Sequence, residues 1–171
     1  MSGVAELVFL HALSLSVPST DGLRGAQITY ERFLPELDLA LGVSAEVRQT
    51  ATGDYTGVHT GLALGGRKFW RADRGARLST LPAGSPVGWF FGGAVRAGTT
   101  VTHDDMDDAF LGTTLQLGVS VEIGYRIAPW RQLVITPAVG AEVHRDIDLS
   151  GRMRAWNVGG FTAGLELGWL F

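Results

Sequence analysis

A two-residue alternation of apolar with small or charged side chains is the feature that most limits how this chain can fold. In the last eleven residues one row is apolar, and it consists of Phe161, Ala163, Leu165, Leu167, Trp169 and Phe171. The other row is mostly small or charged, and it consists of Thr162, Gly164, Glu166, Gly168 and Leu170. Successive side chains of a strand point to opposite faces, so this stretch is predicted to be a strand with two unlike faces.

The same pattern recurs along the chain and predicts eight strands in a single domain, residues 1–171. We expect them at 4–17, 24–33, 37–48, 57–70, 87–101, 111–127, 132–147 and 155–171. Short turns are expected at 35–36 and 128–131, and longer connections at 18–23, 49–56, 71–86, 102–110 and 148–154. Strands of this length suit a tilted membrane crossing, which needs about 9–11 residues.

Composition supports a membrane-facing surface. The chain has 14 Lys and Arg residues, but Lys68 is the only Lys, whereas a water-facing sheet uses Lys freely.

The net charge of −3 argues against nucleic-acid binding, and the absence of Cys excludes disulfides and thiolate metal sites. No apolar run is long enough for a membrane-spanning helix. We interpret residues 4–13 as part of the first strand after removal of an export signal; a truncated signal peptide is the alternative.

The two rows differ in a way that suggests which face points outward. The polar row is rich in Gly, Ala, Ser and Thr, as a narrow lumen requires. Its charges are matched in number and suggest an interior ion-pair network of Glu46, Arg48, Arg67, Arg96, Glu122, Arg126, Glu142 and Glu166. We therefore predict an all-β fold, an eight-stranded antiparallel up-and-down transmembrane β-barrel with its apolar row outside. In a soluble ligand-binding barrel, the alternative, the rows would be reversed.

Aromatic residues gather at one rim of this predicted barrel. They are Phe33, Phe69, Trp70, Trp89, Phe91, Tyr125, Trp130, Trp169 and Phe171. Tyr and Trp favour the membrane interface, where the ring is buried and the polar tip stays wet. We predict an aromatic belt at this rim, with Trp70, Trp89, Phe91, Tyr125, Trp130, Trp169 and Phe171 as its main members.

The ending Gly164-Leu165-Glu166-Leu167-Gly168-Trp169-Leu170-Phe171 resembles the C-terminal assembly signal of bacterial outer-membrane barrels, carried by Leu165, Leu167, Trp169 and Phe171. The whole chain, roughly 4–171, resembles the small eight-stranded outer-membrane proteins of the OmpA/OmpX kind. This resemblance implies a place in the outer membrane with both termini in the periplasm. It also implies insertion by the barrel-assembly machinery and no catalytic residues.

Two charged segments are candidate binding sites. Carboxylates at Asp104, Asp105, Asp107 and Asp108 suit a divalent cation, but the spacing is not that of an EF-hand, and a solvated loop is the alternative. Such a cation would bridge to lipopolysaccharide phosphates. The basic group Arg67, Lys68, Arg71, Arg74 and Arg77 suits acidic partners or lipid phosphates, or forms a solvated connection.

The histidines do not form a lipase-like motif, because none of the four has Ser two residues later. His144 shares a face with Glu142, which favours a structural hydrogen bond between them. We expect a non-enzymatic protein without cofactors, with a structural, adhesive or lipopolysaccharide-binding role and a surface partner that the sequence does not name. A lipid A-modifying enzyme of the acyl-hydrolase type is the alternative. Paired charges are expected to plug the interior of so narrow a barrel.

Overall fold

The computed structural model describes nine strands and one short helix. It describes residues 11–20, 23–52, 54–70, 86–104, 106, 109–130, 132–149, 153–157 and 159–171. The strands are β1 (His11–Thr20), β2 (Leu23–Leu34), β3 (Leu39–Thr52), β4 (Tyr55–Phe69), β5 (Gly88–Asp104), β6 (Ala109–Trp130), β7 (Leu133–Asp148), β8 (Met153–Asn157) and β9 (Phe161–Leu170). A 3-10 helix, η1 (Pro35–Leu37), joins β2 to β3.

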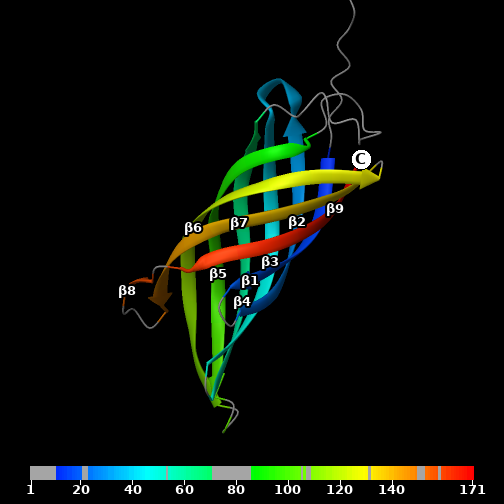
Figure 1. Ribbon diagram of the computed structural model, residues 1–171. Coiled ribbons are helices and arrows are strands. Elements are labelled where there is room, and N and C mark those ends of the chain that lie inside the picture. The colour runs from blue at the N-terminus through cyan, green and yellow to red at the C-terminus, as the bar shows by residue number, and fades with distance from the viewer. Residues whose placement is uncertain are drawn as a thin grey trace, which may run out of the picture.

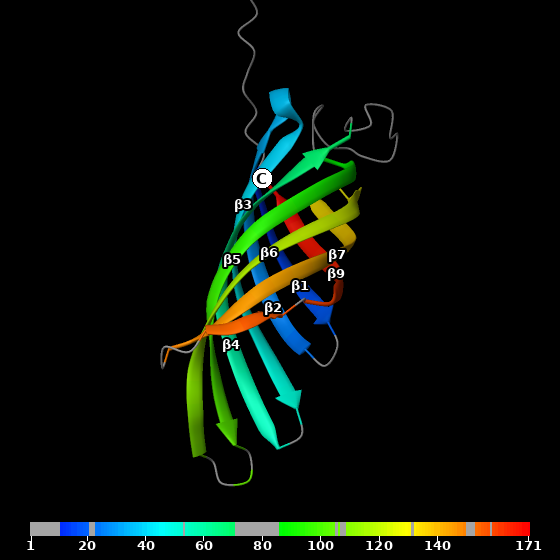
Figure 2. The same cartoon turned by 90° about the vertical axis from the view of Figure 1, so that its left-hand side faces the viewer.

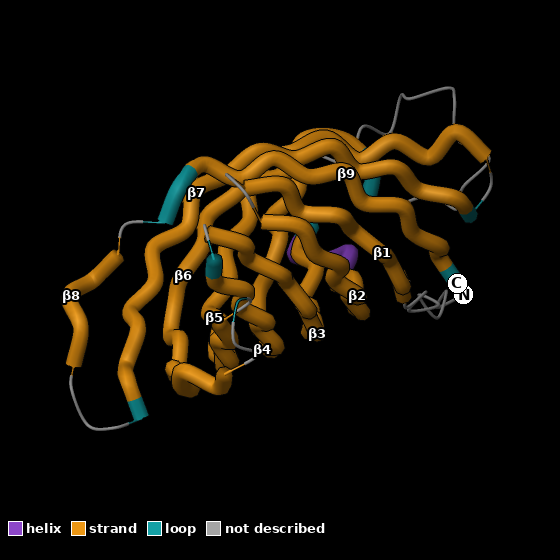
Figure 3. The backbone as a smooth tube through the Cα atoms, turned by 90° about the horizontal axis from the view of Figure 1, so that it is seen from below, coloured by secondary structure: helices purple, strands orange, loops and turns teal. Residues whose placement is uncertain are grey.

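The strands form one closed antiparallel ring of eight. Neighbours in the chain pair from β1 to β7, β7 also pairs with β9, and β9 pairs with β1 (Figure 1). The short β8 and β9 pair with successive parts of β7. Ala141 of β7 pairs with Phe161 of β9, and three residues further on His144 pairs with Asn157 of β8. β8 and β9 are therefore two parts of the eighth strand. The predicted all-β, eight-stranded antiparallel barrel is confirmed, and Figure 3 shows the strands from below.

Within the described part of the chain, no helix is long and apolar enough to cross a membrane.

The barrel has two unlike ends. At the terminal end, His11 and Phe171 exchange backbone hydrogen bonds of 2.9 Å, and η1 closes the β2–β3 turn with Asp38 at φ 47°. At the opposite, loop end, the hairpins β3–β4 and β5–β6 reach farther than the hairpin β1–β2 (Figure 2). The wall is therefore taller on the β3–β6 side.

Several connections predicted from turn-forming residues are shorter than expected. β3 continues to Thr52, which pairs with Tyr55, and β5 continues to Asp104, which pairs with Ala109. The predicted loops 49–56 and 102–110 thus belong mostly to strands, because the ladder of backbone hydrogen bonds continues past the polar residues. Residues 128–130 likewise belong to β6. The predicted beginning of the first strand, 4–10, and most of the segment 71–86 lie outside the described residues.

The segment 18–20 was expected to be a turn, but it is the end of β1. The β1–β2 register passes from Ser16 opposite Gln27 to Ser19 opposite Arg24 and leaves Pro18 out of that ladder. Proline lacks a backbone N–H, so a strand accommodates it where no ladder bond is required.

The two faces of the sheet are sorted as the alternation predicts. On the outside, Leu62 and Val95 keep 61% and 58% of their surface exposed, whereas Arg126 on the inside keeps 1%. Charged side chains thus fill the interior, and apolar side chains cover the wall.

Candidate functional site: the charged interior

The interior is built in layers from the terminal end toward the loop end. An aromatic layer, here called the terminal plug, comes first and is centred on Phe33, Phe69 and Phe90. A first charged layer, the terminal-side cluster, follows and comprises Glu31, Arg67, Glu122, Arg126 and Glu166. A second charged layer, the loop-side cluster, comprises Glu46, Arg48, His59, Arg96 and Glu142. Small side chains occupy the level between the two clusters.

The terminal plug consists of inward-facing rings. Phe33 and Phe69 meet edge to face with ring centres 5.9 Å apart, and Phe69 lies 5.5 Å from Phe90. All three are buried. The prediction that Phe33 and Phe69 join the outer belt is therefore wrong. Each stands two residues from an inward charge, Glu31 or Arg67, and so shares its face.

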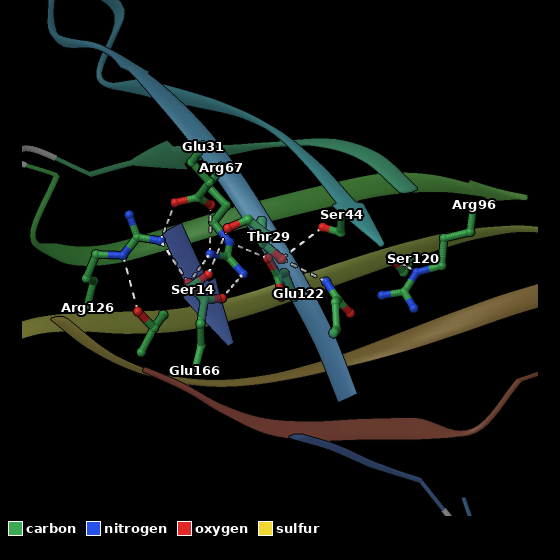
Figure 4. Close-up of polar contacts among 12 residues, drawn as sticks. Ser14, Thr29, Glu31, Ser44, Arg67, Arg96, Ser120, Glu122, Arg126 and Glu166 are labelled. Atoms are coloured by element: carbon green, nitrogen blue, oxygen red, sulfur yellow. Dashed lines mark hydrogen bonds and ion pairs between the residues drawn. The ribbon is translucent and has the colours of Figure 1, made fainter. Parts of the chain in front are cut away.

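The terminal-side cluster is centred on Arg67 (Figure 4). Its Nε donates to Glu122 Oε1 at 2.7 Å, Nη1 to Glu31 Oε1 at 2.8 Å, and Nη2 to Glu166 Oε2 at 2.8 Å. Arg126 Nη2 completes the layer with Glu31 Oε2 at 2.6 Å and Glu166 Oε1 at 3.5 Å. Charge-assisted bonds of this length are the strong ones, and they hold β2, β4, β6 and β9 together across the lumen.

Both arginines of this layer also lie over rings of the plug. The guanidinium of Arg67 is 5.0 Å from the centre of Phe90, and that of Arg126 is 5.3 Å from the centre of Phe69. Cation–π contacts in a site shielded from bulk water strengthen the join between the two layers.

The loop-side cluster crosses the barrel in the same manner. Arg48 donates to Glu46 Oε2 at 2.9 Å and to Glu142 Oε1 at 3.1 Å, and Arg96 donates to Glu46 Oε2 at 2.9 Å. His59 Nε2 lies 3.4 Å from Glu46 Oε1. These contacts connect β3, β4, β5 and β7.

All eight charges predicted for an interior network lie in these two clusters. The clusters also contain Glu31 and His59, which were not among the residues predicted for the network. The expected pair of His144 with Glu142 is not formed: His144 Nε2 lies 3.9 Å from Asp146 Oδ1, and Glu142 binds Arg48. Glu142 is already engaged by a permanently charged donor, because Arg48 Nη1 lies 3.1 Å from its Oε1 and 3.4 Å from its Oε2.

Between the clusters lie two small cavities, of about 60 and 70 Å³, which we call the chamber. Both are lined by Gln27, Arg67, Arg96 and Glu122. The first is otherwise walled mostly by small residues, among them Gly42, Ser44, Ala63, Gly65, Ala94 and Ser120. Each cavity has room for a few water molecules or one small ion.

The aromatic residues predicted for the belt lie at the terminal end of the outer face. Exposed among them are Trp70, Trp89, Phe91, Trp130, Trp169 and Phe171. Tyr125 is half-buried against Trp89, with ring centres 5.2 Å apart. Leu165 and Leu167 continue the exposed row of β9 that ends at Phe171.

The described residues give little support to either charged segment as a binding site. Asp104 Oδ1 accepts a hydrogen bond from the Met106 N–H at 2.9 Å, and the described residues contain no group of three or more His, Asp or Glu that could hold a metal ion. Of the basic group, Arg67 is interior, and Lys68 reaches the carbonyl oxygen of Leu37 outside. The other members lie outside the described residues: Asp105, Asp107, Asp108, Arg71, Arg74 and Arg77.

Comparison with solved structures identifies the class of fold. The chain is similar to Neisserial surface protein A, with a TM-score of 0.52, 12% identity, and coverage of 95% of this chain and 94% of that one. It is equally similar to a major outer membrane protein of Thermus thermophilus, with a TM-score of 0.52, 13% identity, and coverage of 96% and 100%. No protein-family model and no curated protein sequence matches the chain. The fold is that of small outer-membrane β-barrels, as the resemblance in sequence implied.

Proposed function

We propose that this protein is a non-enzymatic β-barrel of the bacterial outer membrane with a closed interior. The observation that carries the proposal is the inverted distribution of side chains. Leu, Val, Ile and Trp cover the wall, while five Glu and four Arg of the two clusters lie inside. A soluble protein rarely exposes a contiguous apolar patch larger than a few hundred Å². A wall of this kind is stable in lipid, where apolar side chains need no cover.

The height of the apolar wall suits a bilayer. On β5 the outward row begins at Trp89 and stays apolar or small until Thr99. Thr99 pairs with Thr60 on β4, and their hydroxyl oxygens are 3.4 Å apart. A tilted strand crosses the hydrocarbon layer in about 9–11 residues, which is the span from the aromatic belt to this threonine pair.

This placement suggests an orientation. In our proposal the terminal end with its aromatic belt lies at the periplasmic interface, and the tall hairpins β3–β4 and β5–β6 project outward from the cell. The hairpins would carry any structural, adhesive or lipopolysaccharide-binding role, because binding residues gather on segments that a rigid scaffold presents to solvent. The apolar row of β9 would be read by the barrel-assembly machinery.

Gel mobility after refolding tests the proposal. Protein refolded from urea into detergent or thin-lipid vesicles is expected to run faster unboiled than boiled, since a closed barrel resists SDS until heated. The matched sample is refolded without detergent or lipid and is expected to precipitate. A protein that stays soluble without detergent and shows one mobility would contradict the membrane proposal and favour a soluble barrel.

A further inference from the structure

The two charged clusters differ in how well their positive and negative charges cancel. The loop-side cluster pairs two Glu with two Arg and adds His59. The terminal-side cluster has three Glu and only two Arg. With all its carboxylates ionised it therefore carries one negative charge more than its arginines neutralise. A surplus charge inside a protein is costly unless something compensates it.

The surplus negative charge of the terminal-side cluster is assigned to Glu122 by its contacts. Both oxygens of Glu31 and of Glu166 contact a guanidinium. Glu122 contacts Arg67 through Oε1 only, and its Oε2 has no partner among the described residues. Its side chain keeps 31% of its surface exposed, against 5% for Glu31, and it lines both cavities of the chamber.

The first cavity offers further oxygen atoms close to this carboxylate. Gln27 Nε2 donates to Thr29 Oγ1 at 3.1 Å, which leaves the side-chain carbonyl oxygen of Gln27 available to the cavity. Thr29 and Ser44 share a hydrogen bond of 2.9 Å, and Ser120 Oγ accepts from Arg96 at 3.3 Å. A carboxylate, an amide carbonyl and hydroxyl groups are the ligands that hard cations prefer.

We propose that the chamber binds one monovalent alkali cation, Na⁺ or K⁺, held by Glu122 Oε2 and the Gln27 carbonyl oxygen. One positive charge balances the terminal-side cluster, whereas a divalent ion would leave a surplus positive charge beside the three arginines that line the chamber, Arg48, Arg67 and Arg96. The volume admits the ion with one or two waters.

Urea unfolding of the refolded full-length barrel tests this proposal. The unfolding equilibrium is measured in N-methylglucamine chloride, then in NaCl and in KCl at the same ionic strength. For the wild type we expect saturable stabilisation by Na⁺, by K⁺ or by both. The unfolding constant should fall about 100-fold when the cation reaches 100 times its dissociation constant.

Two variants separate a bound ion from a general salt effect. Glu122→Gln is expected to abolish the cation response and to be more stable than the wild type in N-methylglucamine, because the surplus charge is gone. Glu36→Gln removes the same charge from the exposed turn η1 and is expected to respond as the wild type does. If Glu122→Gln does not refold, Gln27→Ala takes its place; it leaves every ion pair intact and should weaken the response.

A wild type that unfolds alike in N-methylglucamine, Na⁺ and K⁺ would overturn the proposal. So would a Glu122→Gln or Gln27→Ala variant that responds like the wild type. The heat-dependent gel shift is recorded on every sample, so a failure of the cation site is distinguishable from a failure to form the membrane barrel.

Discussion

Arg67 is the residue on which the interior depends most, because among the described residues it alone contacts three carboxylates. Arg67→Ala would leave Glu31 and Glu166 with only Arg126 and would remove the arginine that Glu122 contacts. Breaking a buried ion-pair network costs about 3–5 kcal/mol. Urea unfolding in vesicles should show a loss of that order. Lys68→Ala, at the next, outward-facing position, is the control and should change stability by about 0.5 kcal/mol or less. Equal losses in the two variants would argue against a network centred on Arg67.

Two glycines of the inner face predict opposite outcomes for the same substitution. A Cβ at Gly124 would lie 2.4 Å from the Phe90 ring and 2.7 Å from the carbonyl oxygen of Pro137, whereas a Cβ at Gly164 meets nothing within 4 Å. Gly124→Ala should therefore destabilise the barrel by about 1–3 kcal/mol through overpacking. Gly164→Ala should be close to neutral. Thermal loss of the compact gel form measures both, and a Gly124→Ala barrel as stable as Gly164→Ala would contradict the tight packing of the plug.

The alternation of side chains is enough to place two rings of the terminal plug inside the barrel. Phe33 follows Glu31 by two residues and Phe69 follows Arg67 by two, so parity alone places both rings inside. Their position near the ends of β2 and β4 suggests the outer belt only if the face on which each side chain lies is ignored. The apparent match of four Glu with four Arg likewise hid Glu31, the fifth. Which Arg meets which Glu depends on the stagger around the ring, which spacing along single strands does not specify.

At the scale of the strand, the cost of a charge on the wall should depend on its depth. Val119 is exposed midway along the apolar outer face of β6. Gln49 is exposed on the outer face of β3, near the loop end of the barrel. Val119→Arg should cost about 2–4 kcal/mol in lipid, and Gln49→Arg about 0–1 kcal/mol. Urea unfolding in vesicles compares the two. Equal costs would mean that the wall does not face hydrocarbon.

The last strand supports a prediction about assembly. Phe171 is exposed, stacks on His11 with ring centres 5.8 Å apart, and ends the apolar row of β9. If the barrel-assembly machinery reads this row, Phe171→Ala should slow folding assisted by the purified machinery several-fold. Trp130→Ala removes an equally outward aromatic from a different strand and should fold at the wild-type rate. Both rates are followed by the appearance of the compact gel form.

Strand ends were harder to predict than strand centres. The sequence predicts turns at Pro18, at Asp104 and at Ala128 with Pro129, yet these residues lie in β1, β5 and β6. Turn-forming residues bias a short peptide, but a neighbouring strand that is already in register supplies hydrogen bonds that outweigh this bias. The number of strands and the sorting of the faces, by contrast, follow from a period that recurs along most of the chain.

For the whole molecule, the layered interior predicts a barrier rather than a channel. The terminal plug fills the lumen with rings, and the chamber has room only for a few waters or a small ion. Vesicles carrying the wild-type barrel should swell in an isotonic sugar solution no faster than empty vesicles. Vesicles with an open porin at the same protein-to-lipid ratio are the positive control. Swelling at the porin rate would show that the plug or the clusters open in the membrane.

The pairing of β1 with β9 has a consequence for the order of events in biogenesis. Until these two strands meet, each would present a row of unpaired N–H and C=O groups to hydrocarbon, where each such group costs several kcal/mol. A partly assembled wall therefore has no stable position in the lipid interior. Insertion must proceed in one step with closure, or a catalyst must hold both edges until the seam forms. The rate at which this protein enters a bilayer should consequently be governed by that seam, and the other seven strand pairs should form before it or together with it.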